Sequence, residues 1–300
     1  MPNIDGSKTP IFDALAEDLK SVGEGNGDEI MCPMCLRKFG RAELKALTKE
    51  HVLSKSLGGT ALVLTCKDCN NSAGHKVQGH LKTLLQMNEG FRGDGHFVGR
   101  FTVFGETVPV GVELKPGTEL LVTPRGGSPR SLAKIENGLK TSASTKWSAQ
   151  FKVPYSPGKA SAGIARAAYL SAFFRFGYEY ILSGPARLLR SEVVSAMDTH
   201  SDRLCLLTGK GGSGLSPNEN GPESVLAPIE LEGGFRFFLA MMRFQRKRDY
   251  WMFCVLPDST QPCETMFTDL QKAVALLGMY SFRMRGDESG EIEVELLRHT

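Results

Sequence analysis

The sequence predicts an α+β fold in which a small cysteine-stapled module precedes a larger α+β domain with a mostly antiparallel sheet. Three observations support this prediction. Two Cys-x-x-Cys pairs lie near the N-terminus, segments of strand-like alternation recur through the rest of the chain, and one long apolar segment at 160–182 has helical length. We expect three parts: an acidic N-terminal arm with one helix at 1–28, the cysteine module at 29–92, and a C-terminal α+β domain at 93–300.

The arm and the module carry clear secondary-structure signals. Thr9-Pro10 begins a predicted helix that ends before Gly23, because Pro fits the first turn of a helix and Gly commonly follows the last. A Gly-rich linker at 23–27 follows. Within the module the sequence predicts a strand carrying Glu50 and His51, a turn at Gly58-Gly59, a strand at 62–65 leading into Cys66, and a helix at 71–87.

The C-terminal domain has the clearest helix signal in the chain. The segment 160–182 is apolar nearly all round, so we expect a buried scaffold helix whose aromatic side chains pack in the core. The other predicted elements are helices at 185–197 and 265–277, and strands at 100–104, 108–114, 119–123, 204–208, 224–231, 235–244, 250–256, 280–284 and 291–297.

The two cysteine pairs, Cys32/Cys35 and Cys66/Cys69, predict one structural zinc site. Four thiolates complete a tetrahedral shell and leave no open position for catalysis. Disulfides are the alternative, but the polar, acidic first 27 residues contain no signal peptide, which favours an intracellular protein and zinc. The other cysteines, at positions 205, 254 and 263, share no ligand spacing and are expected to pack in the core.

The residues between and just after the pairs carry the chemistry. Glu50 and His51 are adjacent in a predicted strand, and Asn70 directly follows Cys69. Neighbouring strand residues point to opposite faces, so Glu50 and His51 cannot both aim at one atom; one can hold a metal while the other orients a water beside it. Carboxylate and amide oxygens suit a hard cation such as Mg²⁺.

The combined motif, Cys-x2-Cys, Glu-His, Gly-Gly and Cys-x2-Cys-Asn, resembles the HNH (ββα-metal) endonucleases, in the zinc-containing variant of the endonuclease VII type. The resemblance covers residues 32–85 and implies a zinc-stapled ββα-metal nuclease module. It further implies that Glu50 and Asn70 bind the catalytic Mg²⁺ or Mn²⁺ and that His51 is the general base. Glu50 stands where many members have Asp, and Asn70 stands in place of the family's last His.

The expected function is therefore a metal-dependent endonuclease that hydrolyses DNA phosphodiester bonds. The cation on Glu50 and Asn70 would stabilise the transition state and the leaving 3′-oxygen, while His51 activates water. We expect a backbone carbonyl to hold the second ring nitrogen of His51. The alternative is a non-catalytic zinc-containing DNA-binding or scaffold protein, in which Glu50 and His51 are merely polar residues on the surface.

Charge favours a polyanionic partner for the module. The whole chain carries only +3, but residues 31–92 contain ten basic residues against four acidic ones. Lys55, Lys67 and Lys76 are the expected DNA-backbone contacts. His75 is either a contact to the scissile phosphate or an exposed helix residue, and its spacing favours the latter.

Further basic stretches occur at 125–190 and 243–248, the second in an expected hairpin turn. The segment 126–144 is rich in Gly, Ser, Lys and Thr and is expected to be a loop that orders on DNA. The glycine-rich run at 209–214 lacks the order of a phosphate-binding loop and is expected to be a surface loop.

The expected partner is double-stranded or branched DNA. The chain contains no run of eighteen apolar residues, the length needed to cross a membrane. We therefore expect a cytoplasmic protein without a membrane partner. The C-terminal domain is expected to provide substrate selection, homodimerisation or contact with a regulatory partner.

Overall fold

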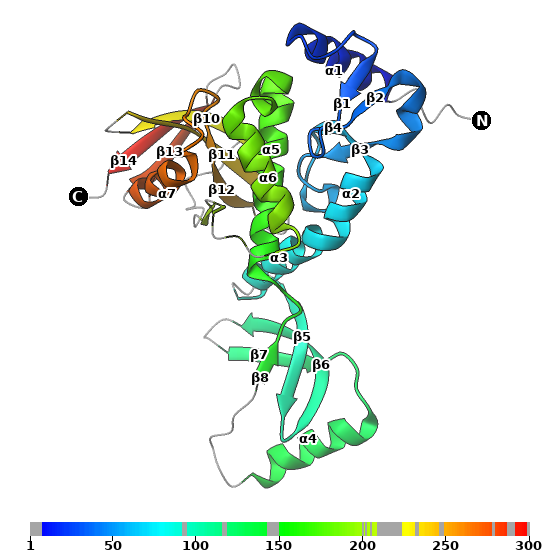
Figure 1. Ribbon diagram of the computed structural model, residues 1–300. Helices are drawn as coiled ribbons and strands as arrows, with labels where there is room; N and C mark the ends of the chain where they lie inside the picture. Colours follow the sequence, from blue (N-terminus) through cyan, green and yellow to red (C-terminus); the bar gives the residue numbers. More distant parts are fainter. Residues whose placement is uncertain are drawn as a thin grey trace. The chain divides into compact units, whose positions relative to one another are not determined.

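The computed structural model describes residues 8–91, 95–115, 119–142, 150–199, 201, 203–204, 206–208, 224–231, 234–245, 249–277, 280–286 and 292–298. The chain divides into two compact units (Figure 1): residues 1–78 together with 158–300, and residues 79–157. The cysteine module and the C-terminal helices thus share one unit, a division that differs from the predicted boundaries at 28 and 92. The α+β class is confirmed, and every described strand pairing is antiparallel.

The first unit begins with the elements of the arm and the module. These are α1 (Thr9–Ser21), β1 (Glu29–Met31), β2 (Lys38–Gly40), a 3₁₀ helix (Arg41–Ala46), β3 (Leu47–His51), a 3₁₀ turn (Lys55–Leu57), β4 (Leu62–Cys66) and α2 (Lys67–Ala73). The predicted helix at 71–87 in fact starts at Lys67. It passes through a π-helical turn at Gly74–Gln78 before α3 (Gly79–Phe91) in the second unit.

The Gly58-Gly59 turn between β3 and β4 needs both glycines. Gly58 has φ +94°, a left-handed conformation that L side chains rarely adopt. A Cβ on Gly59 would lie 1.7 Å from the carbonyl oxygen of Leu53. The turn therefore depends on glycine for its dihedral angles at one position and for close backbone approach at the next.

The scaffold helix α5 (Pro157–Ile181) is buried along most of its length, as predicted, and is followed by α6 (Gly184–Ala196). Its helical path is broken at Gly177, which has φ +64°. The Asp18 carboxylate of α1 lies at this break and accepts a hydrogen bond of 2.8 Å from the backbone N–H of Tyr178. Asp18 thereby satisfies a donor that the break removes from the helix.

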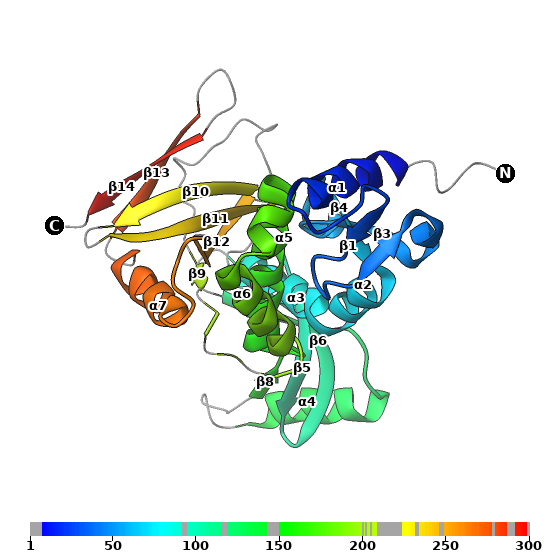
Figure 2. The same ribbon diagram turned by 45° about the horizontal axis from the view of Figure 1, so that its top comes forward.

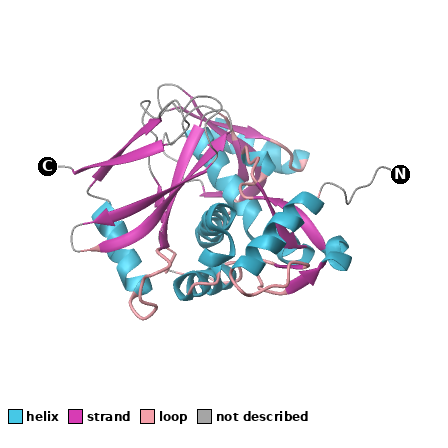
Figure 3. Ribbon diagram, turned by 90° about the horizontal axis from the view of Figure 1, so that it is seen from above, coloured by secondary structure: helices cyan, strands magenta, loops and turns pink. Residues whose placement is uncertain are grey.

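The C-terminal sheet has the strand order β10 (Ser224–Leu231), β11 (Phe235–Gln245), β12 (Asp249–Pro257) and β9 (Leu206–Thr208). Helix α7 (Met266–Leu277) covers one face, where its apolar residues join a core with the sheet. Helix α5 lies on the other side of this sheet (Figure 2). There Phe176 and Tyr180 of α5 pack against Phe238. Helices therefore cover both faces (Figure 3), and β13 (Tyr280–Gly286) pairs with β14 (Ile292–Arg298) separately.

The second unit is a four-stranded sheet with helices on one face. Its strand order is β7 (Glu119–Pro124), β6 (Glu106–Lys115), β5 (Phe97–Val103) and β8 (Gln150–Lys152). Residues from α3 and α4 (Pro129–Thr141) pack with the buried sheet residues in one apolar cluster. This cluster fixes which face of the sheet is inside.

The prediction of a loop at 126–144 was wrong, because α4 occupies most of it. Ser128 caps the helix by accepting a hydrogen bond of 3.0 Å from the Ser131 N–H, and Pro129 takes the first helical position. Leu132 and Ile135 then pack against the sheet. The cap and the apolar spacing outweigh the loop-like composition.

Some sequence predictions fall on positions that the structure does not describe. These are the glycine-rich run at 209–214, Cys205, and the basic turn at 246–248. Within the described parts of the chain, no helix has the length and apolar character needed to cross a membrane.

Gly177→Ala should destabilise the first unit. With φ +64° and ψ −150°, Gly177 lies in a region that essentially only glycine populates, which costs another residue about 1–3 kcal/mol. The new Cβ would also lie 2.1 Å from the Asp18 carboxylate. We expect a loss of unfolding free energy of at least about 1 kcal/mol in chemical denaturation. Gly74→Ala is the matched control: Gly74 has helical φ, and a Cβ at this position would meet nothing closer than 4.0 Å. Equal stability of the two variants would contradict the role of the break.

Candidate active site and metal centre

The four module cysteines come from two tight backbone turns. Cys32 and Cys35 follow β1, where the Cys32 N–H donates to the Arg37 carbonyl at 2.9 Å and the Leu36 N–H donates to the Cys32 carbonyl at 2.8 Å. Leu36 has a positive φ of 59°, which closes the turn. Cys66 ends β4 and occupies the N-cap position of α2, and Cys69 lies in the first turn of that helix.

These turns bring the four sulfur atoms together, all within 4.8 Å of one another. The Cys66 N–H also contacts Cys32 Sγ at 3.4 Å. All four are free thiols, so the alternative of disulfides is not what the structure shows. Four thiols converging from two Cys-x-x-Cys turns fit the ligand set of a structural zinc ion.

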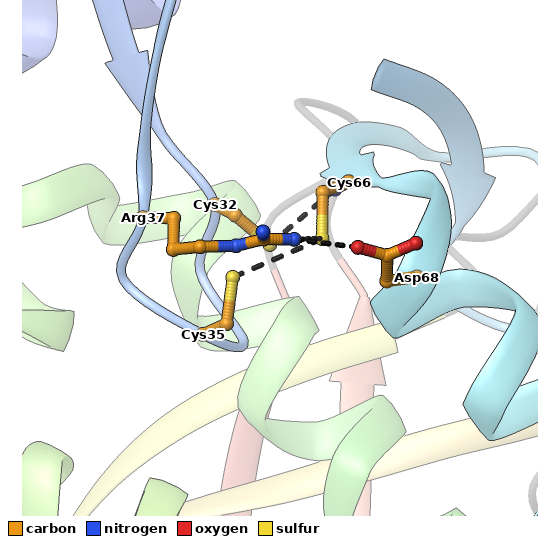
Figure 4. Close-up of polar contacts among 5 residues, drawn as sticks. All are labelled: Cys32, Cys35, Arg37, Cys66 and Asp68. Atoms are coloured by element: carbon orange, nitrogen blue, oxygen red, sulfur yellow. Dashed lines mark hydrogen bonds and ion pairs between the residues drawn. The ribbon is translucent and has the colours of Figure 1, made fainter. Parts of the chain in front are cut away.

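Arg37 places a positive charge beside the cluster (Figure 4). Its Nη2 lies 3.6 Å from Cys66 Sγ and 2.7 Å from an Asp68 carboxylate oxygen. A hydrogen bond with Cys32, together with burial, raises the pKa of the Cys35 thiol to about 12. A metal ion must therefore displace protons to bind, so its affinity for the cluster should rise with pH.

The first cysteine turn is held by side chains of α5 and α6. Tyr178 Oη donates to the Met31 carbonyl at 2.6 Å and accepts from the Met31 N–H at 2.8 Å. Tyr169 Oη donates to the Pro33 carbonyl at 3.2 Å, and Arg190 Nη1 donates to the Met34 carbonyl at 3.0 Å. Burial raises the pKa values of both tyrosines, so both hydroxyls stay protonated and able to donate.

Glu50 points into the protein and is only 3% exposed. Its Oε1 lies 2.5 Å from Nη1 of Arg166 on α5, which is 4% exposed. Its Oε2 accepts a hydrogen bond of 2.9 Å from Thr65 Oγ1 on β4. The carboxylate is thus engaged by a buried cation and a hydroxyl.

His51 and Asn70 are both partly exposed. His51 pairs with Leu62 in the register of β3 and β4, and its side chain lies on the face of β3 opposite Glu50, as the strand period predicts. Asn70 lies on α2, which packs beside β3 and β4. Among the described residues, no hydrogen bond joins Glu50, His51 and Asn70 to one another. The expected carbonyl partner of His51 is likewise not found there.

The predicted nucleic-acid contacts have different surroundings. Lys55, Lys67 and His75 are exposed. Lys76 instead pairs with Asp198 at 2.5 Å. A hollow of about 500 Å³ adjoins the cysteine cluster and is lined by Lys76, Asp198 and residues of the first turn, but by none of Glu50, His51 and Asn70.

Sequence reasoning missed the residues that support the site from outside the module. Arg166 and the two tyrosines belong to the apolar segment 160–182, where they carry no motif. The available clue was Arg166 itself: a charged residue within the apolar stretch Ala160–Phe174 is expected to pair with a buried acid.

Comparison with known proteins supports the motif. Residues 32–85 match the family model described as HNH endonuclease, so this segment is similar to the HNH endonuclease domain, a similarity that suggests a nuclease acting on nucleic acid. No curated protein and no solved structure matches the chain.

Cys66→Ser should unfold the module rather than only slow it, because structural zinc contributes its binding energy to folding. We expect loss of bound zinc by elemental analysis and a lower melting temperature. Cys263→Ser is the matched control, since Cys263 is exposed and outside the cluster. Full zinc content and unchanged stability in Cys66→Ser would show that the cluster is not a zinc site.

Proposed function

We propose, on the premise that residues 32–85 form an HNH endonuclease domain, that the protein is a metal-dependent endonuclease that hydrolyses DNA phosphodiester bonds. The observation that carries the proposal is the family match over a segment in which the Glu-His strand and the Asn70 helix both adjoin the four-cysteine cluster. The cluster supplies rigidity, because strand β4 and helix α2 meet at Cys66.

In this proposal His51 is the general base. A partly exposed imidazole on β3 can take a proton from a water molecule that attacks the phosphorus. A bound Mg²⁺ or Mn²⁺ would supply the counter-charge for the transition state and for the leaving 3′-oxygen. Asn70 would hold this cation through its amide oxygen, and exposed Lys55 and Lys67 would contact the DNA backbone.

Glu50 is the second proposed cation ligand, but its carboxylate already has two partners within the protein. Its carboxylate lies against Arg166 and Thr65, on the strand face opposite His51. Ligation therefore requires the carboxylate to turn away from Arg166 or to be shared between Arg166 and the cation. The alternative role is structural: Glu50 would neutralise Arg166 and fix β3 on α5.

His51→Ala tests the base. Removing a general base typically slows a reaction about 10²–10⁴-fold, so we expect loss of metal-dependent nicking of plasmid, linear and branched DNA with Mg²⁺ or Mn²⁺. DNA affinity, zinc content and melting temperature should stay at wild-type values. DNA binding by both proteins with cleavage by neither would support the alternative, a non-catalytic zinc-containing DNA-binding or scaffold protein.

A double-mutant cycle decides the role of Glu50. Glu50→Met and Arg166→Met should each lower the free energy of unfolding by about 3–5 kcal/mol, because each leaves a buried charge unpaired. The double variant should recover most of that loss. A cation ligand would make the recovered double variant inactive in DNA cleavage; a purely structural Glu50 would leave it active, which would contradict the proposed ligand role.

A further inference from the structure

A row of basic residues crosses the sheet of the second unit. Lys152 on β8 pairs directly with Arg100 on β5, and Arg100 pairs with Pro109 on β6. The Arg125 N–H donates to the Pro109 carbonyl at 2.9 Å, which places Arg125 next in the same row, just after β7. With strands about 4.8 Å apart, the row from Lys152 to Arg125 spans about 14 Å.

This row lies on the face of the sheet that α3 and α4 leave open. Along β5, Phe97 and Val103 are buried, whereas Val98 and Arg100 are exposed. The apolar cluster with α3 and α4 contains Phe97 and its strand partner Val112, so it lies on the opposite face from Arg100. Lys152 and Arg125 are exposed as well.

The charges of the row are not neutralised by carboxylates. Within the described part of the chain, no ion pair involves Arg100, Lys152 or Arg125. Arg125 contacts the His96 ring instead. Glu113, an acid that the register places on this face, is paired with Lys115. Like charges directly opposite on neighbouring strands are destabilising, so Arg100 and Lys152 together favour an anionic partner.

The positions around the row suit a sugar–phosphate chain. The adjacent row consists of Gln150, Thr102 and Thr107, which all carry hydrogen-bonding side chains. On the other side lies Gly111; a Cβ there would come within 2.9 Å of Arg125 Nε, so the missing side chain lets the guanidinium lie across the sheet. None of the residues that the register places on this face of β5, β6 and β8 is aromatic, which leaves no platform for base stacking.

We propose that this open sheet face, defined by Arg100, Arg125 and Lys152, binds the DNA backbone and holds the substrate of the nuclease independently of base sequence. The proposal rests on the proposed function for the identity of its ligand. The charge of the surface identifies this ligand as a polyanion. Three cations that form no ion pair with any described residue, and that have hydroxyl and amide neighbours, match phosphates, which occur once per about 1.7 Å of duplex axis.

The test compares two triple variants in a His51→Ala background of the full chain, which should bind DNA without cutting it. The first is Arg100→Gln, Arg125→Gln and Lys152→Gln. The matched control, Arg130→Gln, Lys134→Gln and Lys140→Gln, removes the same charge from the same unit, but from exposed positions on α4, which packs on the opposite face of the sheet. Binding to a fluorescent duplex of arbitrary sequence is measured by anisotropy from about 50 to 200 mM salt, a range over which phosphate contacts weaken strongly, with melting temperatures recorded.

The sheet triple variant should bind at least about tenfold more weakly, and the slope of log affinity against log salt should fall by about 3, roughly one per phosphate contact. The control should change affinity less than about twofold, because its side chains lie on α4, which covers the face of the sheet opposite to the proposed surface. Equal binding by the two variants, or no DNA binding by the parent, would overturn the proposed DNA-binding surface.

DNA cleavage by the wild-type protein is measured separately. If DNA binds through this face but the wild-type protein does not cleave it, the nuclease proposal alone is refuted. If the wild-type protein cleaves DNA and the sheet triple variant binds DNA as tightly as the parent, the surface proposal alone is refuted.

Discussion

The convergence of four thiols is the constraint on which the module depends. Two turns separated by thirty residues place their sulfur atoms within 4.8 Å of one another, and this fixes the end of β4, the start of α2 and the loop after β1 at one point. A short β-hairpin has little stability alone. Anchored at Cys66, the same hairpin can hold Glu50 and His51 in fixed directions.

The cluster is in turn supported by α5 and α6. Three backbone carbonyls in and beside the first turn accept hydrogen bonds from side chains of α5 and α6: Met31 from Tyr178, Pro33 from Tyr169, and Met34 from Arg190. Buried carbonyls without donors are costly, so these side chains belong to the stability of the cysteine turn. Because Arg166 of α5 also contacts Glu50, one helix outside the family-matched segment supports both the four-cysteine cluster and the proposed catalytic strand.

The positive charges of the chain fall into two physically different groups. Lys76, Lys134 and Lys140 are paired with carboxylates, so most of their attraction for a distant polyanion is cancelled locally. Arg100 and Lys152 oppose each other across two strands, and their repulsion is relieved when phosphate binds. Pairing, rather than the count of lysines and arginines, therefore distinguishes a binding surface from a solvated one.

Local rules made much of the fold predictable. The Cys-x-x-Cys spacing, the Gly58-Gly59 turn and the opposite directions of Glu50 and His51 follow from the geometry of a few neighbouring residues, and the sequence alone determined them. The tertiary structure decided which residues meet across the chain: Arg166 with Glu50, Tyr178 with Met31, and Arg100 with Lys152. These contacts join positions far apart in the sequence, and no local period or spacing encodes them, because they exist only once packing has brought separate elements together.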